Sequence, residues 1–295
     1  MKRRNFLKDI TVGSLIVNLR PGLFAQGENF PDLSVMQGED PASLTKAAVS
    51  ALGGMTRFIS KGDKVMIKPN IGWDRKPEQA ACTNPDVIKT LVELVVEAGA
   101  GDVVVMDHPC NPARRTYIRS GIADAAKNAG ADVPYPNEHK LKKVPINGAV
   151  LKEWEVYRDF LEVDKIINVP IAKHHSLSRV TLGMKNWLGA LGGNRNQLHQ
   201  NLDRAMVDLA AYFKPALTVL DAYRILFRNG PQGGRLSDVK MHKTVAAGVD
   251  WVAVDTLGAS FFELKPSDLK FLQIGYERGF GEIDLEKCTI EKRTI

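Results

Sequence analysis

Short apolar runs that alternate with helical patterns set the strongest limit on how this chain can fold. They lie at residues 64–68, 102–106, 165–172 and 216–220, and the second of them reads DVVVM. Continuous runs of this kind are typical of strands buried on both faces of a parallel sheet. The sequence therefore predicts an α/β fold with a mainly parallel sheet and helices on both of its faces.

Capping residues and apolar spacing predict the helices between these strands. Asp40-Pro41 and Asn84-Pro85 each place a capping side chain before a proline at the first helical position. Glycines mark the ends of both helices, near residues 53 and 99. Further helices are expected at 112–129, 181–191, 202–213, 251–262 and 266–278, and further strands at 33–36, 244–249 and 287–292.

The N-terminal segment has the pattern of an export signal. It begins MKRRNFLK, a paired arginine followed by Phe-Leu-Lys, and an apolar stretch covers residues 10–19. We interpret residues 1–25 as a twin-arginine signal peptide, and residues 26–295 as a single α/β domain, built as one unit or as two lobes. This interpretation implies a periplasmic protein that meets the twin-arginine translocase during export and keeps no membrane span after cleavage. The alternative is a basic amphipathic helix on a cytosolic protein.

Charge and cysteine content exclude some classes of function. The formal net charge is +6, but residues 1–25 carry +4 of it, which leaves +2 for the remainder. No basic stripe with interleaved aromatic residues remains, so nucleic-acid binding is not expected. The chain has three cysteines and no C-x-x-C motif. Because an iron–sulfur cluster normally needs four closely spaced thiolates, no such cluster is expected.

Polar side chains follow four of the predicted strands at the point where each strand ends. They are Lys68, Asn70, Asp107, His108, Lys173, His174, His175 and Asp221. Ligands bind to open parallel sheets outside the carboxyl ends of the strands, so we expect these groups to share one cleft. Asp107, Asp221 and one histidine are the candidates for acid/base chemistry. The alternative is that each group is an ordinary solvated loop residue.

Residues 168–193 hold the densest set of candidate binding groups. Thr181 is expected to cap a helix whose N-terminal amide groups attract an anion. Lys185 follows one turn later and Asn186 lies beside it. Together with Lys173 and Arg179, these residues suit a small anionic ligand such as a carboxylate or a phosphate. The alternative is a surface helix with ordinary charges.

A transition metal is a second candidate ligand. His174, His175 and His199, with nearby carboxylates, are of the residue types that bind such metals, although their spacing fits no standard zinc motif. Adjacent residues of a strand point to opposite faces. Only one of His174 and His175 is therefore expected to face the cleft. Ordinary hydrogen-bonded histidines are the alternative.

A glycine-rich segment at residues 229–234 comes shortly after the predicted strand at 216–220 and Asp221. Backbone N–H groups around Gly230 and Gly233 could cradle an anion. A plain turn explains the same residues, because no Walker motif is present.

Several segments together resemble the domain of unknown function 362 family. They are VMIKPN at 65–70, TNP at 83–85, NVP at 168–170 leading to KHH at 173–175, VTLGMKN at 180–186, VLD at 219–221 with NGP at 229–231, and AGVD at 247–250 with AVD at 253–255. We also include Asn84, which lies in one of these segments, among the candidate binding residues. The resemblance implies no particular activity, because the family is named for lacking an assigned function. Many members carry clustered cysteines in a ferredoxin-like segment, and this chain lacks them.

A looser similarity connects the chain with the nickel-pincer lactate racemase family. Members have a histidine, a lysine that anchors the cofactor and a further histidine, and His174 or His175, Lys185 and His199 follow that order. The resemblance implies a racemase-like enzyme as one alternative.

From the residues themselves, we expect an exported enzyme that binds an anionic substrate or cofactor, with or without a metal. A non-catalytic periplasmic binding or accessory protein is the other alternative.

Overall fold

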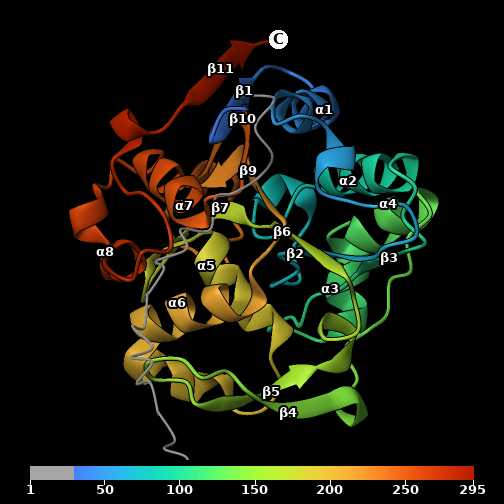
Figure 1. The fold of residues 1–295 in the computed structure, drawn as a ribbon, viewed down its shortest axis with the longest axis vertical. Coiled ribbons are helices and arrows are strands. Elements are labelled where there is room, and N and C mark those ends of the chain that lie inside the picture. The colour runs from blue at the N-terminus through green and yellow to red at the C-terminus, as the bar shows by residue number, and fades with distance from the viewer. Residues whose placement is uncertain (1–29) are drawn as a thin grey trace, which may run out of the picture.

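A nine-stranded sheet forms the centre of the computed structural model, which describes residues 30–295 (Figure 1). The predicted export signal lies outside the described residues. Four strands run parallel as direct neighbours, in the order β3 (Asp102–Val105), β2 (Lys64–Pro69), β6 (Lys165–Val169) and β9 (Leu217–Leu226). These are the four strands predicted from the apolar runs, and the parallel arrangement is confirmed.

The rest of the sheet is mixed. Strand β10 (Val239–Gly248) pairs antiparallel with both β9 and β1 (Leu33–Gln37), and β11 (Ile290–Thr294) runs parallel to β1 at the edge. The predicted strand at 165–172 is divided at Pro170, which has no N–H to donate to a neighbouring strand. The chain continues as β7 (Ile171–His175), which pairs with the later part of β9 and with β8 (Arg179–Thr181). A separate hairpin contains β4 (Leu141–Pro145) and β5 (Glu153–Tyr157).

Helices cover both faces of the sheet, as predicted. One layer contains α1 (Pro41–Ala51), α2 (Pro85–Glu97), α3 (Ala113–Arg119) and α4 (Ile122–Asn128). The other contains α5 (Gly183–Asn186), α6 (Leu202–Phe213), α7 (Trp251–Ser260) and α8 (Lys270–Glu277). The side chains of Asp40 and Asn84 accept backbone N–H groups at the starts of α1 and α2, so both capping predictions are confirmed. No helix within residues 30–295 is both long enough and apolar enough to cross a bilayer.

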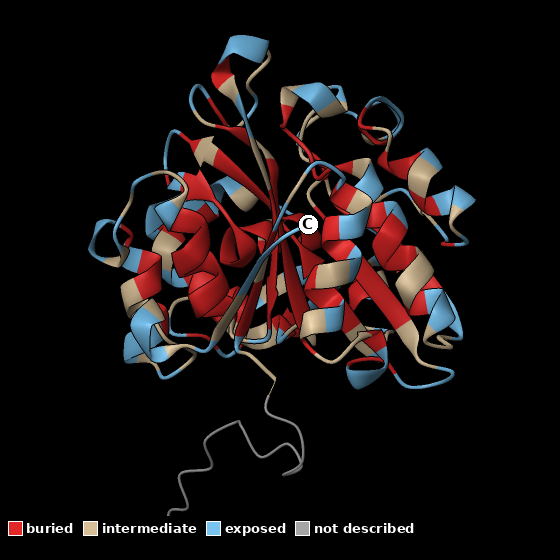
Figure 2. Ribbon diagram, turned by 90° about the horizontal axis from the view of Figure 1, so that it is seen from above, coloured by how far each residue is buried: buried red, intermediate tan, exposed pale blue. Residues whose placement is uncertain are grey.

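Each face of the sheet has its own apolar core, and the alternation of side chains along each strand decides which residue enters which core. In β2, Val65 and Ile67 pack beneath α1 and α2, whereas Met66 packs on the α5–α8 side. Figure 2 shows buried strands between two layers of helices whose outer surfaces are exposed. Lys68 lies two residues after Met66, so its side chain points to the α5–α8 side.

Candidate functional site

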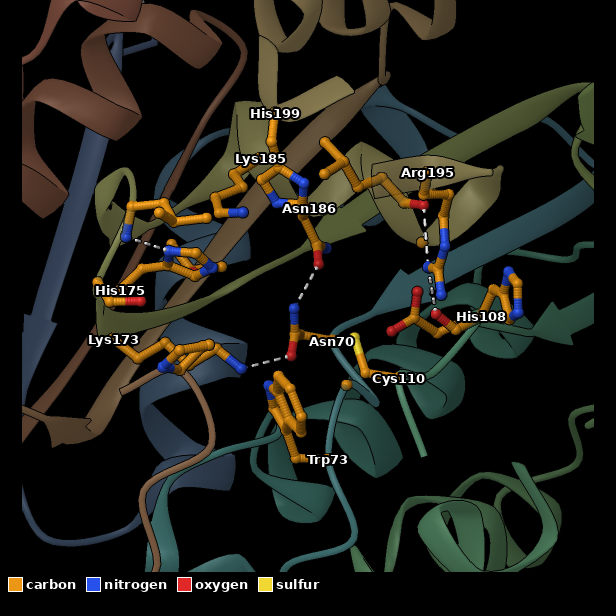
Figure 3. Close-up of a pocket in the computed structure, with 18 of the residues that line it drawn as sticks. Asn70, Trp73, His108, Cys110, Lys173, His175, Lys185, Asn186, Arg195 and His199 are labelled. Carbon is orange, nitrogen blue, oxygen red and sulfur yellow. Dashed lines mark hydrogen bonds between the residues drawn. The ribbon is translucent and has the colours of Figure 1, made fainter. Parts of the chain in front are cut away.

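A cavity of about 460 Å³ lies at the carboxyl ends of the parallel strands (Figure 3). Nine of the residues predicted from the sequence line it: Asn70, Asp107, His108, Lys173, His175, Thr181, Lys185, Asn186 and His199. They come from the ends of β2, β3, β7 and β8, from α5, and from the segment that follows α5. The position agrees with the rule that open parallel sheets bind ligands at this edge. We call this space the cationic cavity, because its lining includes Lys173, Lys185 and Arg195.

An ion pair between Lys68 and Asp107 lies beside the cavity. Lys68 is completely buried, and its Nζ donates to Asp107 Oδ1 at 2.6 Å and to Asn186 Oδ1 at 3.2 Å. The other carboxylate oxygen of Asp107 accepts the backbone N–H of Ile71 at 2.5 Å. Burial lowers the pKa of Lys68, and the Asp107 charge opposes that shift. Both oxygens of Asp107 are therefore engaged within the protein, and its charge is balanced by Lys68.

Two asparagines connect this ion pair with Lys173. Asn70 Nδ2 donates to Asn186 Oδ1 at 3.1 Å, and Lys173 Nζ donates to Asn70 Oδ1 at 2.9 Å and to the carbonyl of Ala81 at 2.5 Å. Both acceptors of Lys173 are neutral. Burial lowers the pKa of Lys173 to about 8. This lysine therefore brings a positive charge to the cavity wall without a carboxylate to balance it.

Lys185 is the second lysine of the cavity, and Figure 3 shows its amine end pointing into the space. Its exposed fraction is 8%, and no hydrogen bond or ion pair within residues 30–295 engages its Nζ. Burial and then the neighbouring Lys173 charge lower the pKa of Lys185 to about 8. Arg195 adds a third cation, whose guanidinium donates to the backbone carbonyls of His108, Leu188 and Pro109.

Two neutral donors complete this wall of the cavity. His175 Nδ1 accepts the backbone N–H groups of Leu177 and Ser178 at 3.1 and 3.3 Å, which leaves the ring proton on Nε2. Burial, aided by the Lys185 charge, lowers the pKa of His175 to about 3, so the ring is neutral near pH 7. Thr181 is buried, and its hydroxyl has no hydrogen-bond partner among the described residues. A ligand in the cavity would give both groups an acceptor.

The start of α5 differs from the prediction. Thr181 is the last residue of β8 and does not cap the helix. Instead, the Asp255 carboxylate of α7 accepts the first amide groups of α5, from Gly183 at 2.6 Å and from Met184 at 2.8 Å. These amides are already satisfied by a carboxylate, so they do not contribute to anion binding. The expected helix at 181–191 is limited to α5 and a 3₁₀ turn that ends at Ala190.

Asp221 and Asn84 lie outside the cavity, which corrects the expectation that they share it. Asp221 follows Val219 by two positions in β9 and therefore points to the α1–α4 side, opposite to Lys68. Its carboxylate accepts the backbone N–H groups of Asn84 at 2.7 Å and of Tyr223 at 3.0 Å. Burial raises the pKa of Asp221 to about 6. Asp221 holds the start of α2, and the Asn84 side chain caps the same helix.

The glycine-rich segment also lies outside the cavity, apart from Pro231. The backbone N–H of Gly230 donates to His174 Nδ1 at 3.1 Å, so His174 faces this segment while His175 faces the cavity. A side chain at Gly233 would meet Leu226 at 2.8 Å. Gly230 and Gly233 thus form a packed turn and not an anion cradle.

The side chains in the cavity do not fit a metal ion. Within residues 30–295, no three His, Cys, Asp or Glu side chains come together in a way that could hold one. His174 faces away, and Nδ1 of His175 is engaged by two backbone N–H groups. His199 is exposed, and its Nδ1 lies 3.1 Å from the Asn196 carbonyl. We therefore assign no chemistry to a metal.

Sequence reasoning did not predict several residues of the site, of which Trp73, Cys110 and Arg195 are examples that line the cavity. Trp73 and Cys110 lie in irregular segments and Arg195 lies in a 3₁₀ segment, and none of them belongs to a motif. Gly189 also lines the cavity, and a Cβ at this position would lie 1.7 Å from Asp107 Oδ1. The glycines at 189, 192 and 193 were the one available signal, because glycine permits a close approach of the backbone.

Comparisons with known proteins find one similar sequence and two solved structures of lower similarity. A thylakoid-associated protein from Synechocystis sp. is 26% identical over 233 residues, which cover 76% of this chain and 70% of that protein. The lactate racemase apoprotein from Thermoanaerobacterium thermosaccharolyticum has a TM-score of 0.45 at 11% identity, over 81% of this chain and 58% of that chain. A protein from Thermotoga maritima has a TM-score of 0.40 at 12% identity, over 76% of this chain and 60% of that chain. This chain thus spans less than two thirds of either solved structure.

The family comparison covers most of the sheet and the whole of the cationic cavity. The matched segment, residues 65–260, runs from β2 to the end of α7 and contains all the cavity residues named above. The chain therefore belongs to the family described as "Domain of unknown function (DUF362)".

Proposed function

We propose that the cationic cavity binds a small organic anion that carries a carboxylate or phosphate group. The observation that carries this proposal is the charge of the wall, where Lys173, Lys185 and Arg195 face one space and none of them contacts a carboxylate of residues 30–295. Buried charges are costly unless they are paired. An anion would provide that pairing and would also accept hydrogen bonds from the Thr181 hydroxyl and from the ring N–H of His175.

We further propose that the protein is an enzyme whose reactive group is Lys185, because its Nζ points into the cavity and makes no hydrogen bond or ion pair within residues 30–295. Groups with a pKa close to the working pH are the most effective general acids and bases, and the pKa of Lys185 is about 8. Asp107 is occupied by Lys68 and Ile71, and Asp221 lies on the other face of the sheet. The alternative, a non-catalytic binding protein, would use the same cations without proton transfer.

Binding of oxalate, measured by calorimetry, tests the anion site. A charge-assisted hydrogen bond contributes about 1.5–3 kcal/mol, so we expect Lys185→Met to lower the affinity for oxalate by about tenfold or more. Two variants serve as controls. Asp221→Asn should bind oxalate as the unchanged protein does, because Asp221 lies outside the cavity, and so should Lys127→Met, which removes an exposed charge from α4. Equal affinity of Lys185→Met and the unchanged protein would contradict the proposal.

The same titration has an expected pH profile. The anion favours the protonated lysines, so its affinity should be constant below about pH 8 and should fall as the pH rises through that value, where Lys173 and Lys185 lose their protons. Oxalate keeps its charge over this range, so the profile reports on the protein. A profile that stays flat up to about pH 10, where ordinary lysines titrate, would contradict the assignment of these two lysines.

For the location of the protein, we propose export to the periplasm. The support is the paired arginine of the N-terminal segment MKRRNFLK. We expect replacement of Arg3 and Arg4 by lysine to leave the precursor in the cytoplasm of a bacterial host, as measured by cell fractionation and immunoblotting. A periplasmic protein with an unrelated signal peptide serves as the control. Unchanged periplasmic accumulation of the double variant would remove the support for this route.

A further inference from the structure

We propose that Lys185 is a nucleophile that forms an imine with the carbonyl carbon of a small 2-oxo acid held in the cationic cavity. The inference rests on the proposed anion site and adds a substrate class and a covalent step to it. The three lysines of the site differ in whether their amine is free to react, and this difference is the basis of the assignment.

Lys68 and Lys173 are both engaged by hydrogen bonds. Lys68 Nζ donates to three oxygens, those of Pro69, Asp107 and Asn186, and Lys173 Nζ donates to Asn70 and Ala81. Lys185 Nζ makes no such bond within residues 30–295 and points into the cavity. Of these three amines, that of Lys185 is therefore the one that is free to react with a molecule in the cavity.

The surroundings of Lys185 increase its nucleophilicity. A lysine is activated when it is removed from water or placed beside another cation, and both conditions hold here, because Lys185 is 8% exposed and has Lys173 as a charged neighbour. At pH 7, a pKa of about 8 leaves about a tenth of the amine unprotonated. This fraction is roughly 200-fold larger than for an ordinary lysine with a pKa near 10.4.

The other groups of the cavity fit the two ends of a 2-oxo acid. Lys173 and Arg195 supply positive charge for the carboxylate, and Thr181 and His175 supply neutral donors for the carbonyl oxygen. In a 2-oxo acid the carbonyl carbon is bonded directly to the carboxylate carbon. A carboxylate held by the cations of the wall would therefore place the carbonyl carbon beside the Lys185 amine.

The step balances without an oxidant or a reductant. The lone pair of the neutral Lys185 amine forms a C–N bond to the carbonyl carbon, and the carbonyl π electrons move to the oxygen. A proton passes from nitrogen to oxygen to give a carbinolamine. The hydroxyl then leaves as water after it takes up one proton, and the nitrogen lone pair completes the protonated imine.

Borohydride trapping with pyruvate as the probe tests the inference. Borohydride reduces the imine to a stable amine, which peptide mass spectrometry locates in the sequence. We expect one adduct, at Lys185. In Lys185→Arg, which keeps the charge but replaces the reactive amine, the yield of the adduct should fall by at least about tenfold. The far-UV circular dichroism spectrum of Lys185→Arg should match that of the unchanged protein, which shows that the variant is folded. Exposed lysines such as Lys127 provide the internal control for non-specific reaction.

The possible outcomes separate this inference from the proposed function. Oxalate binding without any pyruvate adduct would overturn the imine and leave the anion site intact. An adduct that forms equally well with acetone, in a protein that does not bind oxalate, would overturn the anion site. An adduct at Lys173, or adducts spread over exposed lysines, would overturn the assignment to Lys185.

Discussion

Replacement of Lys68 by methionine is expected to lower the free energy of unfolding by about 3–5 kcal/mol, because it leaves a buried carboxylate without its cation. Methionine fills a similar volume, so most of the loss should come from the uncompensated charge of Asp107. Urea unfolding at neutral pH, followed by circular dichroism, measures the change. An exposed lysine on α4, Lys127, gives the matched control, and Lys127→Met should change the stability by less than about 0.5 kcal/mol.

A second substitution identifies the cause of this loss. Asp107→Asn removes the charge but keeps an oxygen that can accept the backbone N–H of Ile71. The double variant Lys68→Met, Asp107→Asn should therefore be more stable than Lys68→Met alone, with a coupling energy of about 1–3 kcal/mol. If the double variant is no more stable than the single one, packing around Lys68 and not its charge accounts for the loss.

Replacement of Gly189 by alanine is expected to have an effect of similar size through steric contact. The added Cβ would lie 1.7 Å from Asp107 Oδ1 and 2.8 Å from Lys68 Nζ, distances that no arrangement of the present ion pair permits. The pair must separate or the backbone must move, and we expect a loss of about 3 kcal/mol or more, together with weaker oxalate binding. Thermal unfolding and calorimetry provide the two measurements.

The matched control is Gly54→Ala. Gly54 has a φ of 80° and a ψ of 168°, a conformation that is essentially restricted to glycine, but no atom lies within 4 Å of the added Cβ, so its substitution tests backbone strain alone, at about 1–3 kcal/mol. If Gly189→Ala is no more destabilising than Gly54→Ala, the contact with Asp107 is not the reason for the glycine.

The sheet and most of the residues that line the cavity could be predicted from the sequence, because both depend on local patterns. Buried runs identified the parallel strands, and the polar residues after them identified Lys173 and Asp107. Asp221 does not follow the end of a strand, because β9 continues to Leu226, and its side chain points to the other face of the sheet. Two residues before it, Val219 belongs to the α1–α4 core, so the period of two along a strand could have corrected the expectation that Asp221 lines the cavity.

Other features depend on contacts between distant parts of the chain, and no local pattern reveals them. Asp255 caps α5 from more than 70 residues away, so Thr181 looked like the only available cap. Arg195 reaches the cavity from a 3₁₀ segment, with backbone carbonyls as its acceptors. Carbonyl groups are present at every residue, so the sequence around Arg195 has no feature that marks its position.

The pairing of β1 with β10 has a consequence for protein production. Residues 65–260 contain the cavity but exclude β1 and β11, which lie on the far side of β10. A fragment trimmed to those limits would expose five residues at the end of β10, from Thr244 to Gly248, as an open edge of unpaired backbone groups. Open edges of this kind pair with other chains and promote aggregation. The soluble unit for expression therefore has to be wider than the segment that defines the family.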